Sequence, residues 1–205
     1  QQSGQDWHYV LFKNRIPGDR SQVTGVAWNK SRVSKDGVPY RIPINDNTPD
    51  DFEWDRFPHA VKFSAGQGKT DVVVISLHMK AGSGSDRDQR ESEAKMLLEK
   101  LPNIQAATDD KDIVLIGDTN ITGTSEQTSP LFVAGGFRDL LPANTTTVAW
   151  GNRRFDRVFV PIQPEFGSST QTTFSVPQNE RDSHRLKLSD HYRIAVDVAV
   201  MDDDD

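Results

Sequence analysis

The chain has 205 residues, of which 35% are hydrophobic, and a formal net charge of −6 at pH 7. This length suits one domain with one substantial core. The acidic balance argues against a broad basic surface for nucleic acid, although a bound cation and a few arginines can still serve a phosphate substrate. The absence of cysteine excludes disulfides and thiolate chemistry, and no apolar stretch is long enough to span a membrane. We expect one domain over residues 1–201 and a solvated acidic tail over 202–205.

The first third of the chain predicts an irregular excursion and a hairpin. Residues 38–54 are rich in proline, asparagine and aspartate, which predicts a long loop before Arg56. The segment Gly66–Thr70 has some likeness to a P-loop, but the first glycine of that motif is missing and no helix follows. We therefore interpret it as a hairpin turn between two strands.

Two apolar runs end in polar side chains. Residues 72–77 are almost all β-branched or aliphatic and too short for a helix, so they predict a buried strand that ends at His78. Residues 113–116 repeat this pattern and lead into Gly-Asp-Thr-Asn, where glycine and asparagine tolerate the tight backbone that lifts side chains off a strand end. Asp118 and Asn120 are two residues apart and can therefore face the same way.

A helix is predicted between these two strands, capped by Ser85 or Asp86 and ending at Pro102. Its apolar positions follow the i, i+3, i+4, i+7 spacing of a helix packed on a sheet. These inner positions are Ala94, Leu97, Leu98 and Leu101. The positions expected on the solvent side are Arg87, Asp88, Arg90, Glu91 and Glu93.

Two further strands carry polar groups near their ends. Residues 155–160 predict a strand in which Asp156 stands in an apolar run, and a buried acid needs a partner or a function. The alternative is a surface ion pair of Asp156 with Arg154 or Arg157, which would contribute little to stability. Ser189-Asp190-His191 directly precedes residues 192–200, which alternate as a half-buried strand does.

Together these groups can supply the ligands of a metal site. The oxygens of Asp118, Asn120 and Asp190 suit a hard cation, with Mg²⁺ first and Mn²⁺ or Ca²⁺ as alternatives. Alone, each motif has a simpler interpretation, because Asp and Asn favour turns for local hydrogen-bonding reasons.

The histidines can move protons near neutral pH. His78 or His191 can activate water or protonate a leaving oxygen, and Asp156 can hold an imidazole in one tautomer. Without the other motifs, His78 would equally well be a core histidine with its hydrogen bonds satisfied.

Four motifs in fixed order carry a resemblance to a known family. They are Leu77-His78, Gly117-Asp118-Thr119-Asn120, Phe155-Asp156-Arg157-Val158 and Ser189-Asp190-His191. In this order they resemble the endonuclease/exonuclease/phosphatase superfamily, which includes deoxyribonuclease I and exonuclease III. The resemblance implies an α/β fold, a two-layer β-sandwich flanked by helices. It also implies a divalent-metal-dependent phosphodiesterase, with nucleic acid as the leading substrate and in-line attack of water.

The resemblance also implies residue roles. Asp190 would bind the metal, while Asp118 and Asn120 would orient water and phosphate or hold a second ion. Arg56 starts a segment that resembles a family strand at which an arginine meets substrate phosphate, and Asn120 would contact the substrate as well.

The two histidines take distinct roles under the same resemblance. His191 would pair with Asp156 and act on the nucleophile or the phosphate, and His78 would be the second, deoxyribonuclease-like histidine.

One departure from the family pattern matters. Members begin with a strand carrying Asn and a second strand ending in Gln-Glu, whose Glu is a principal metal ligand, and nothing before Leu11 matches either. We expect an upstream segment that completes the fold. The alternatives are a lipid or small-molecule phosphoesterase of the same superfamily, and a non-catalytic binding module or inactive fragment. A glycan on the sequon Asn120-Ile121-Thr122 would block the proposed site, which favours a bacterial source over a glycosylating secretory route.

Overall fold

The computed structural model describes residues 6–12, 23–43, 54–123 and 125–202. Its centre is a six-stranded sheet with the strand order β3-β4-β5-β6-β8-β7, in which β5 and β6 are parallel and all other neighbours antiparallel. The strands are β3 (Ser34–Arg41), β4 (His59–Ser64), β5 (Asp71–His78), β6 (Ile113–Asp118), β7 (Phe137–Asp139) and β8 (Asp156–Pro161). The predicted apolar runs thus form the middle of this sheet.

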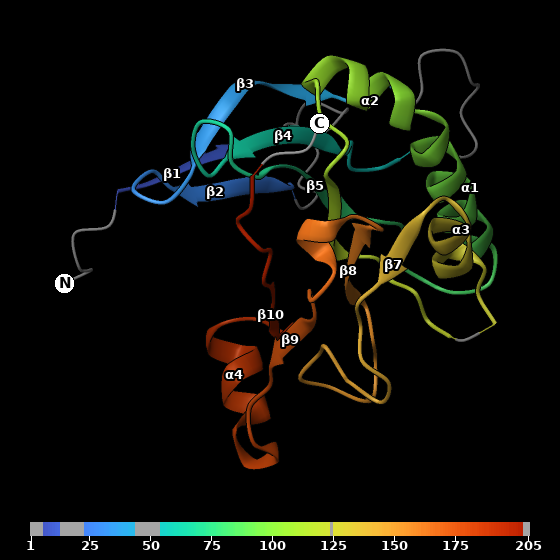
Figure 1. Ribbon diagram of the computed structural model, residues 1–205. Coiled ribbons are helices and arrows are strands. Elements are labelled where there is room, and N and C mark those ends of the chain that lie inside the picture. Colours follow the sequence, from blue (N-terminus) through green and yellow to red (C-terminus); the bar gives the residue numbers. More distant parts are fainter. Residues whose placement is uncertain (1–5, 13–22, 44–53, 124, 203–205) are drawn as a thin grey trace.

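Three helices cover one face of the central sheet (Figure 1). They are α1 (Ser85–Glu99), α2 (Leu101–Thr108) and α3 (Thr128–Ala134). The main core lies beneath them, where Leu97, Ile104 and Phe132 pack against strand residues such as Ile75 and Leu115. All five side chains are fully buried, so this contact is the chief hydrophobic contribution to the fold.

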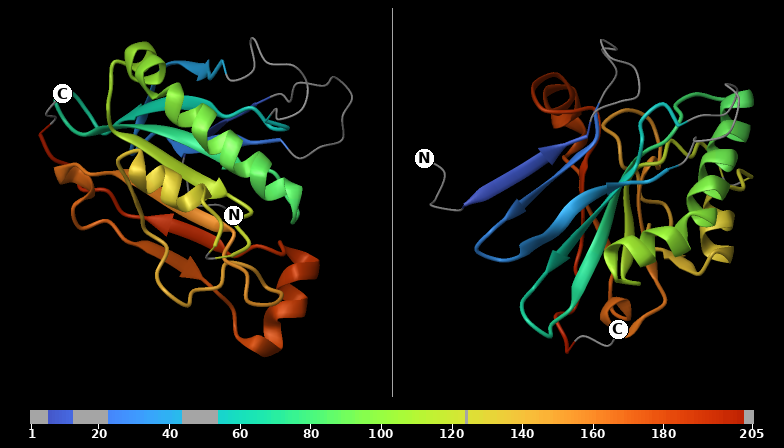
Figure 2. Two further views of the ribbon diagram at one scale, coloured as in Figure 1. Left: turned by 90° about the vertical axis from the view of Figure 1, so that its right-hand side faces the viewer. Right: turned by 90° about the horizontal axis from the view of Figure 1, so that it is seen from above.

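The opposite face is covered by two separate two-stranded sheets (Figure 2). They are β1 (Trp7–Leu11) with β2 (Gly25–Asn29), and β9 (Gln171–Phe174) with β10 (Arg193–Val196). The short helices η1 (Pro164–Phe166), η2 (Gln178–Glu180) and α4 (Arg181–Lys187) lie in the same C-terminal third. The predicted α/β sandwich, with sheets inside and helices outside, is confirmed.

Several predicted boundaries are wrong. The helix does not end at Pro102, because that residue lies in the first turn of α2, where its missing N–H costs nothing. The last strand is shorter than 192–200 and covers Arg193–Val196. The loop predicted over 38–54 begins later, since β3 continues to Arg41, and residues 44–53 lie outside the described part of the chain.

The end of the described chain returns to the sheet. The hairpin turn predicted at Gly66–Thr70 does join β4 to the antiparallel β5. Lys69 of this turn forms an isolated β-bridge and an ion pair with Asp202. Among the described residues, no helix combines the length and the apolar character needed to cross a membrane.

Candidate active site

Three polar side chains lie in one row across neighbouring strands. His78, the last residue of β5, pairs with Asp118, the last residue of β6, and Asp118 pairs with Asp156, the first residue of β8. Gly117 makes this close approach possible, because a Cβ there would lie 2.1 Å from the Leu77 carbonyl oxygen. Its φ of 143° is also one that other residues rarely adopt. The row therefore depends on glycine at the end of β6.

His191 completes the cluster from a distant part of the sequence. Its Nδ1 lies 2.9 Å from Oδ2 and 3.1 Å from Oδ1 of Asp156, and its Nε2 lies 3.8 Å from Oδ2 of Asp118. The Nε2 of His78 lies 3.5 Å from the same oxygen of Asp118. Two histidines therefore flank one carboxylate, and one of them is held by a second carboxylate.

The alternative of a surface ion pair for Asp156 does not hold. Arg157 instead forms an ion pair with Asp139, and Arg154 donates to the carbonyl of Pro142 over 3.0 Å. The backbone N–H of Asp156 is bound by the hydroxyl of Thr147 at 3.0 Å. Asp156 is therefore free to orient the imidazole of His191.

The two histidines have opposite electrostatic surroundings. The hydrogen bond from His191 to Asp156 raises the pKa of His191 to about 9, against the opposing effect of burial. Burial lowers the pKa of His78 to about 4, and the charges of Arg56 and His191 act in the same direction. At neutral pH one imidazole is therefore charged and the other neutral, a division suited to one proton donor and one acceptor.

Asp118 is a partly buried carboxylate with a side chain that is 18% exposed. Burial, and next the charge of Asp156, raise the pKa of Asp118 to about 6. Such a carboxylate gains from any cation placed against it. One ligand atom each from Asp118, Asp156 and His191 lie within 4.8 Å of one another. The carboxylate oxygens of this group are the ligands that a hard divalent cation prefers.

Asn120 and Arg56 meet at one backbone carbonyl. The side-chain amide of Asn120 donates to the Met79 oxygen over 3.0 Å, and Nη1 of Arg56 donates to the same oxygen over 3.4 Å. The backbone N–H of Asn120 donates to Oδ1 of Asp118 over 3.0 Å, and asparagine tolerates the φ of 51° found there. The structure thus places both residues beside the row, and Met79 is a contact that sequence reasoning missed.

Asp190 is the predicted site residue that the structure does not bring into the cluster. Its side chain is exposed and lines a separate cavity with Trp150, Arg185 and Ser189. Its charge still acts on His191, whose pKa it helps to raise. The contact that Asp190 makes to the site is through its backbone, because its carbonyl accepts from the N–H of Ala149 at 2.8 Å.

The supporting groups behind the site include two that were expected at the surface. Arg90 and Glu93 of α1 are both fully buried, so the prediction of solvent-facing positions is wrong for them. Arg90 forms an ion pair with Glu126, and Glu93 accepts from the N–H of Lys80 at 3.0 Å. The sequence carries no local signal of this arrangement, because Glu126 is 36 residues from its partner.

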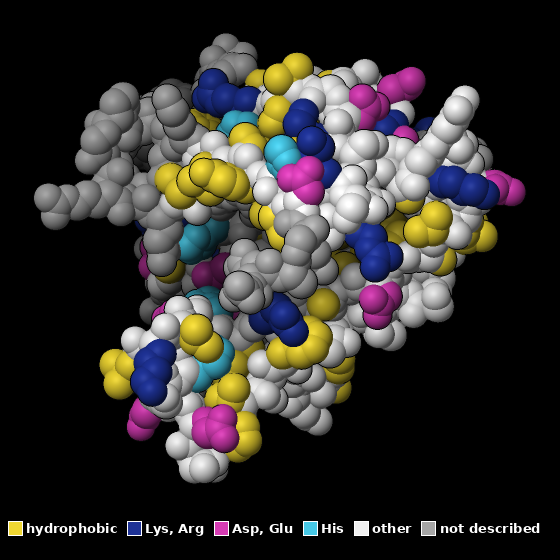
Figure 3. All heavy atoms as spheres, turned by 90° about the vertical axis from the view of Figure 1, so that its left-hand side faces the viewer, with side chains coloured by type: hydrophobic (Ala, Val, Ile, Leu, Met, Phe, Trp, Pro, Cys, Tyr) yellow, Lys and Arg dark blue, Asp and Glu magenta, His cyan; other side chains and the backbone are white. Residues whose placement is uncertain are grey.

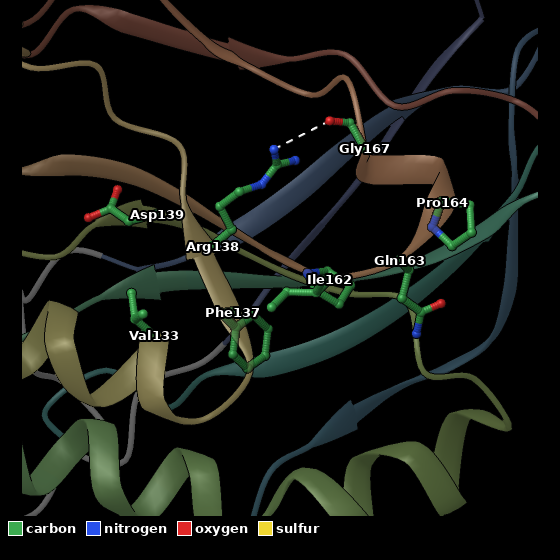
Figure 4. Close-up of a pocket in the computed structure, with 9 residues that line it drawn as sticks. Val133, Phe137, Arg138, Asp139, Ile162, Gln163, Pro164 and Gly167 are labelled. Carbon is green, nitrogen blue, oxygen red and sulfur yellow. Dashed lines mark hydrogen bonds between the residues drawn. The ribbon is translucent and has the colours of Figure 1, made fainter.

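One face of the molecule is hollowed. Figure 3 shows a hollow on one face of the molecule in which histidine and acidic side chains gather. A different cavity of about 600 Å³ lies at the edge strand β7 and is shown in Figure 4. It is lined by apolar side chains such as Phe137 and Ile162, and Arg138 there donates to the Gly167 carbonyl over 3.3 Å. None of the predicted site residues lines this second cavity.

The fold is similar to that of solved endonuclease/exonuclease/phosphatase family proteins, the fold that the motifs predict. The human Nocturnin catalytic domain with bound sulfate matches with a TM-score of 0.66 and 14% identity, over 95% of this chain and 73% of that one. A Bacteroides thetaiotaomicron mannosyl-6-phosphatase matches with a TM-score of 0.63 and 15% identity, over 94% of this chain and 77% of that one. D. rerio TDP2 complexed with a single-strand DNA product matches with a TM-score of 0.59 and 18% identity, over 91% of this chain and 75% of that one.

At these identities the likeness establishes the fold alone. No protein-family model matches the chain, and no curated protein does. Roles for the individual residues therefore depend on the geometry of this site.

Proposed function

We propose that the protein is a divalent-metal-dependent phosphodiesterase that hydrolyses nucleic-acid phosphodiester bonds by in-line attack of water. The observation that carries the proposal is the Asp156–His191 pair facing Asp118 and His78 at the strand ends. A charged and a neutral imidazole around a carboxylate can donate and accept the two protons that such a hydrolysis moves. Structural neighbours that include a phosphatase and a protein complexed with single-strand DNA support this class of chemistry.

A divalent cation would supply charge neutralisation at the phosphate oxygens and a more acidic attacking water. We propose Mg²⁺, with Mn²⁺ or Ca²⁺ as alternatives, held by Asp118 together with Asn120 and Asp190. The raised pKa of Asp118 supports its part in this set. Asp190 has the weakest support of the three, because its side chain is exposed and lines a different cavity.

The histidines divide the proton transfers. His191, charged at neutral pH, presents its Nε2 proton to a phosphate oxygen or to the leaving oxygen, while Asp156 holds its Nδ1. His78, neutral at the same pH, accepts a proton from the attacking water at its Nε2. Arg56 contacts the phosphate from the side of the Met79 carbonyl.

A second candidate is hydrolysis of a small sugar or lipid phosphoester by the same site. The net charge of −6 favours it, because an acidic protein repels long polyanions. The presence of a mannosyl-6-phosphatase among the structural neighbours supports it as well. A third candidate is a non-catalytic binding module that keeps this fold.

Parallel assays with Mg²⁺ on oligonucleotides, supercoiled plasmid, sphingomyelin and sugar phosphates separate these candidates. We expect cleavage of nucleic acid, lost in the Asp118→Asn variant. Cleavage of only a lipid or sugar phosphoester would replace the substrate proposal. Equal background rates for wild type and Asp118→Asn on every substrate would favour the binding module.

A further inference from the structure

The edge of β8 that faces β7 is only partly covered by a neighbouring strand. β7 pairs with β8 from Pro161 to Phe159, and just beyond it the N–H of Leu140 donates to the Val158 carbonyl over 2.9 Å. Backbone groups that face one edge recur every second residue, so the N–H of Val158 and both backbone groups of Asp156 face this same edge. In the part of the chain that the structure describes, no strand lies opposite these three groups. They therefore need other partners.

Two buried side chains take the place of a strand at this edge. The hydroxyl of Thr147 accepts from the N–H of Asp156 over 3.0 Å. The side-chain amide of Gln171 binds the other two groups: its Oε1 accepts from the N–H of Val158 over 2.9 Å, and its Nε2 donates to the Asp156 carbonyl over 3.0 Å. One primary amide thus presents the acceptor and the donor that a neighbouring strand would present. All three backbone groups are satisfied in this way.

Gln171 reaches β8 from a different sheet. It is the first residue of β9, its side chain is buried, and it pairs with Val196 of β10. The contact around it is apolar, because Ile194 and Val196 pack against a buried cluster that contains Val158. A polar group in such a place costs free energy unless it is hydrogen-bonded. The reverse orientation of the amide would place oxygen against oxygen, so its two bonds fix one position of β9 relative to the end of β8.

This end of β8 carries the carboxylate that orients the site histidine. Both oxygens of Asp156 lie within hydrogen-bond distance of Nδ1 of His191, at 2.9 Å and 3.1 Å. The preceding carbonyl, of Phe155, accepts from the N–H of Thr119 over 2.8 Å and from its hydroxyl over 2.7 Å. The backbone on both sides of Asp156 is therefore held by side chains from separate segments. A shift of this backbone would move the carboxylate, and the imidazole with it.

We propose that Gln171 is a positioning residue for the proposed hydrolysis, whose amide holds the backbone of Asp156 so that the carboxylate keeps the imidazole of His191 in place. The inference rests on the proposed function and adds a residue from outside the cluster at the strand ends. Gln171 transfers no proton itself and acts through Asp156. A misplacement of about 1 Å at a catalytic group can cost about 10²-fold in rate, so loss of this amide should lower kcat.

The first test is kinetic. Gln171→Met keeps the length of the side chain and removes both hydrogen bonds. We expect kcat for Mg²⁺-dependent hydrolysis of a chromogenic phosphodiester to fall about 10- to 100-fold, with KM changed less than about 2-fold. Gln171→Asn, whose amide is one methylene too short to reach both groups, should show the same loss and replaces the methionine variant if that variant does not fold. The matched control is Ser169→Ala, which removes a buried hydrogen bond to the Asp197 carbonyl and should keep the wild-type kcat.

The second test needs no turnover and uses NMR of the whole chain in EDTA. In Gln171→Met the amide proton of Val158 should exchange faster with solvent, because it has lost its acceptor. The amide proton of Phe159, which pairs with Leu115 on the other edge of β8, should change only as much as the stability of the whole fold. The downfield Nδ1–H resonance of His191, which reports its hydrogen bond to the carboxylate, should weaken or disappear. Ser169→Ala should leave that resonance unchanged.

Failure of this inference and failure of the proposed function give different results. If wild type hydrolyses no phosphodiester but Gln171→Met loses the His191 resonance, the positioning role stands and the hydrolase proposal fails. If wild type hydrolyses the substrate with Mg²⁺ and a folded Gln171→Met variant has the same kcat, the hydrolase stands and the positioning role is wrong. An equal loss of kcat in Ser169→Ala would also overturn the inference, because the loss would then follow from lower stability alone.

Discussion

Arg90 and Glu126 form a bidentate ion pair in which both side chains are fully buried, with Nη2 of the arginine 3.0 Å from Oε2 of the glutamate. Arg90 also donates to the carbonyls of Lys80 and Gly82, over 2.8 Å and 3.1 Å. Glu126 accepts from the N–H of Thr122 at 3.1 Å. Burial raises the pKa of Glu126, but the hydrogen bonds from Arg90 and Thr122 outweigh it and leave the pKa lowered. One pair thus fixes the loop after β5 and the loop after β6.

Removing the charge of Glu126 should therefore affect stability and activity together. We expect Glu126→Gln to lower the free energy of unfolding in urea by about 3–5 kcal/mol, because it leaves the buried Arg90 without a counter-charge. Glu91→Gln is the matched control, since Glu91 is a partly exposed glutamate of α1, the helix that carries Arg90, and accepts from the N–H of Gln127. We expect Glu91→Gln to lower the free energy of unfolding by less than about 0.5 kcal/mol. Equal losses for the two variants would contradict this interpretation of the pair.

Gly117 should tolerate no side chain. Gly117→Ala places a Cβ against the Leu77 carbonyl and forces a φ of 143° on alanine. We expect a loss of at least about 2 kcal/mol in the free energy of unfolding, and lower activity because Asp118 moves from His78. Gly123→Ala is the control, because nothing lies within 4 Å of a Cβ there. A Gly117→Ala variant that unfolds at the same urea concentration as wild type would show that the approach of β5 and β6 is not tight.

The charge state of His191 should depend on Asp156. In a histidine NMR titration in EDTA, we expect His191 to stay protonated up to about pH 9, and His78 to be neutral above about pH 4. Asp156→Asn should lower the pKa of His191, because it weakens the hydrogen bond and leaves the burial. The lowered pKa of His59, whose main cause is burial, should not change. An unchanged pKa for His191 in the variant would remove the assignment of His191 as the proton donor.

Stability should follow the same titration. The pKa of His191 in the folded protein is above its ordinary value of 6.5. The stabilisation that the Asp156–His191 pair gives to the folded state is therefore fully present below pH 6.5, and it is lost as the pH rises through about 9.

Glu93 should make the protein less stable in alkali. Burial raises the pKa of its carboxyl from 4.5 to about 8, against the hydrogen bond from Lys80. The folded state therefore holds a proton that the unfolded state releases, so stability falls as the pH rises from 4.5 through about 8. Glu93→Gln keeps an acceptor for the N–H of Lys80. We expect the free energy of unfolding of Glu93→Gln to fall less than that of wild type between neutral pH and about pH 9. Equal falls for the two proteins would contradict this role of Glu93.

Much of the fold is predictable because apolar runs dominate it. The buried runs that became β5, β6 and β8 are short, β-branched and bounded by turns, so their burial follows from composition. The polar residues at the ends of these runs then lie at the ends of neighbouring strands, so the sequence alone predicts that His78, Asp118 and Asp156 are site residues.

The remaining features depend on contacts between distant residues. Helical periodicity assigns charged Arg90 and Glu93 to solvent, and only the presence of Glu126 and the Lys80 N–H explains their burial. The exposure of Asp190 depends likewise on the path of the chain before β10.

The most direct test of the account is hydrolysis of a chromogenic phosphodiester by this chain with Mg²⁺, repeated in EDTA and with His191→Ala. We predict hydrolysis that EDTA abolishes, and a rate lower by about 10²–10⁴-fold in His191→Ala, the usual loss when a general acid or base is removed. A folded His191→Ala variant that hydrolyses the substrate at the wild-type rate would show that the Asp156–His191 pair is not the catalytic centre.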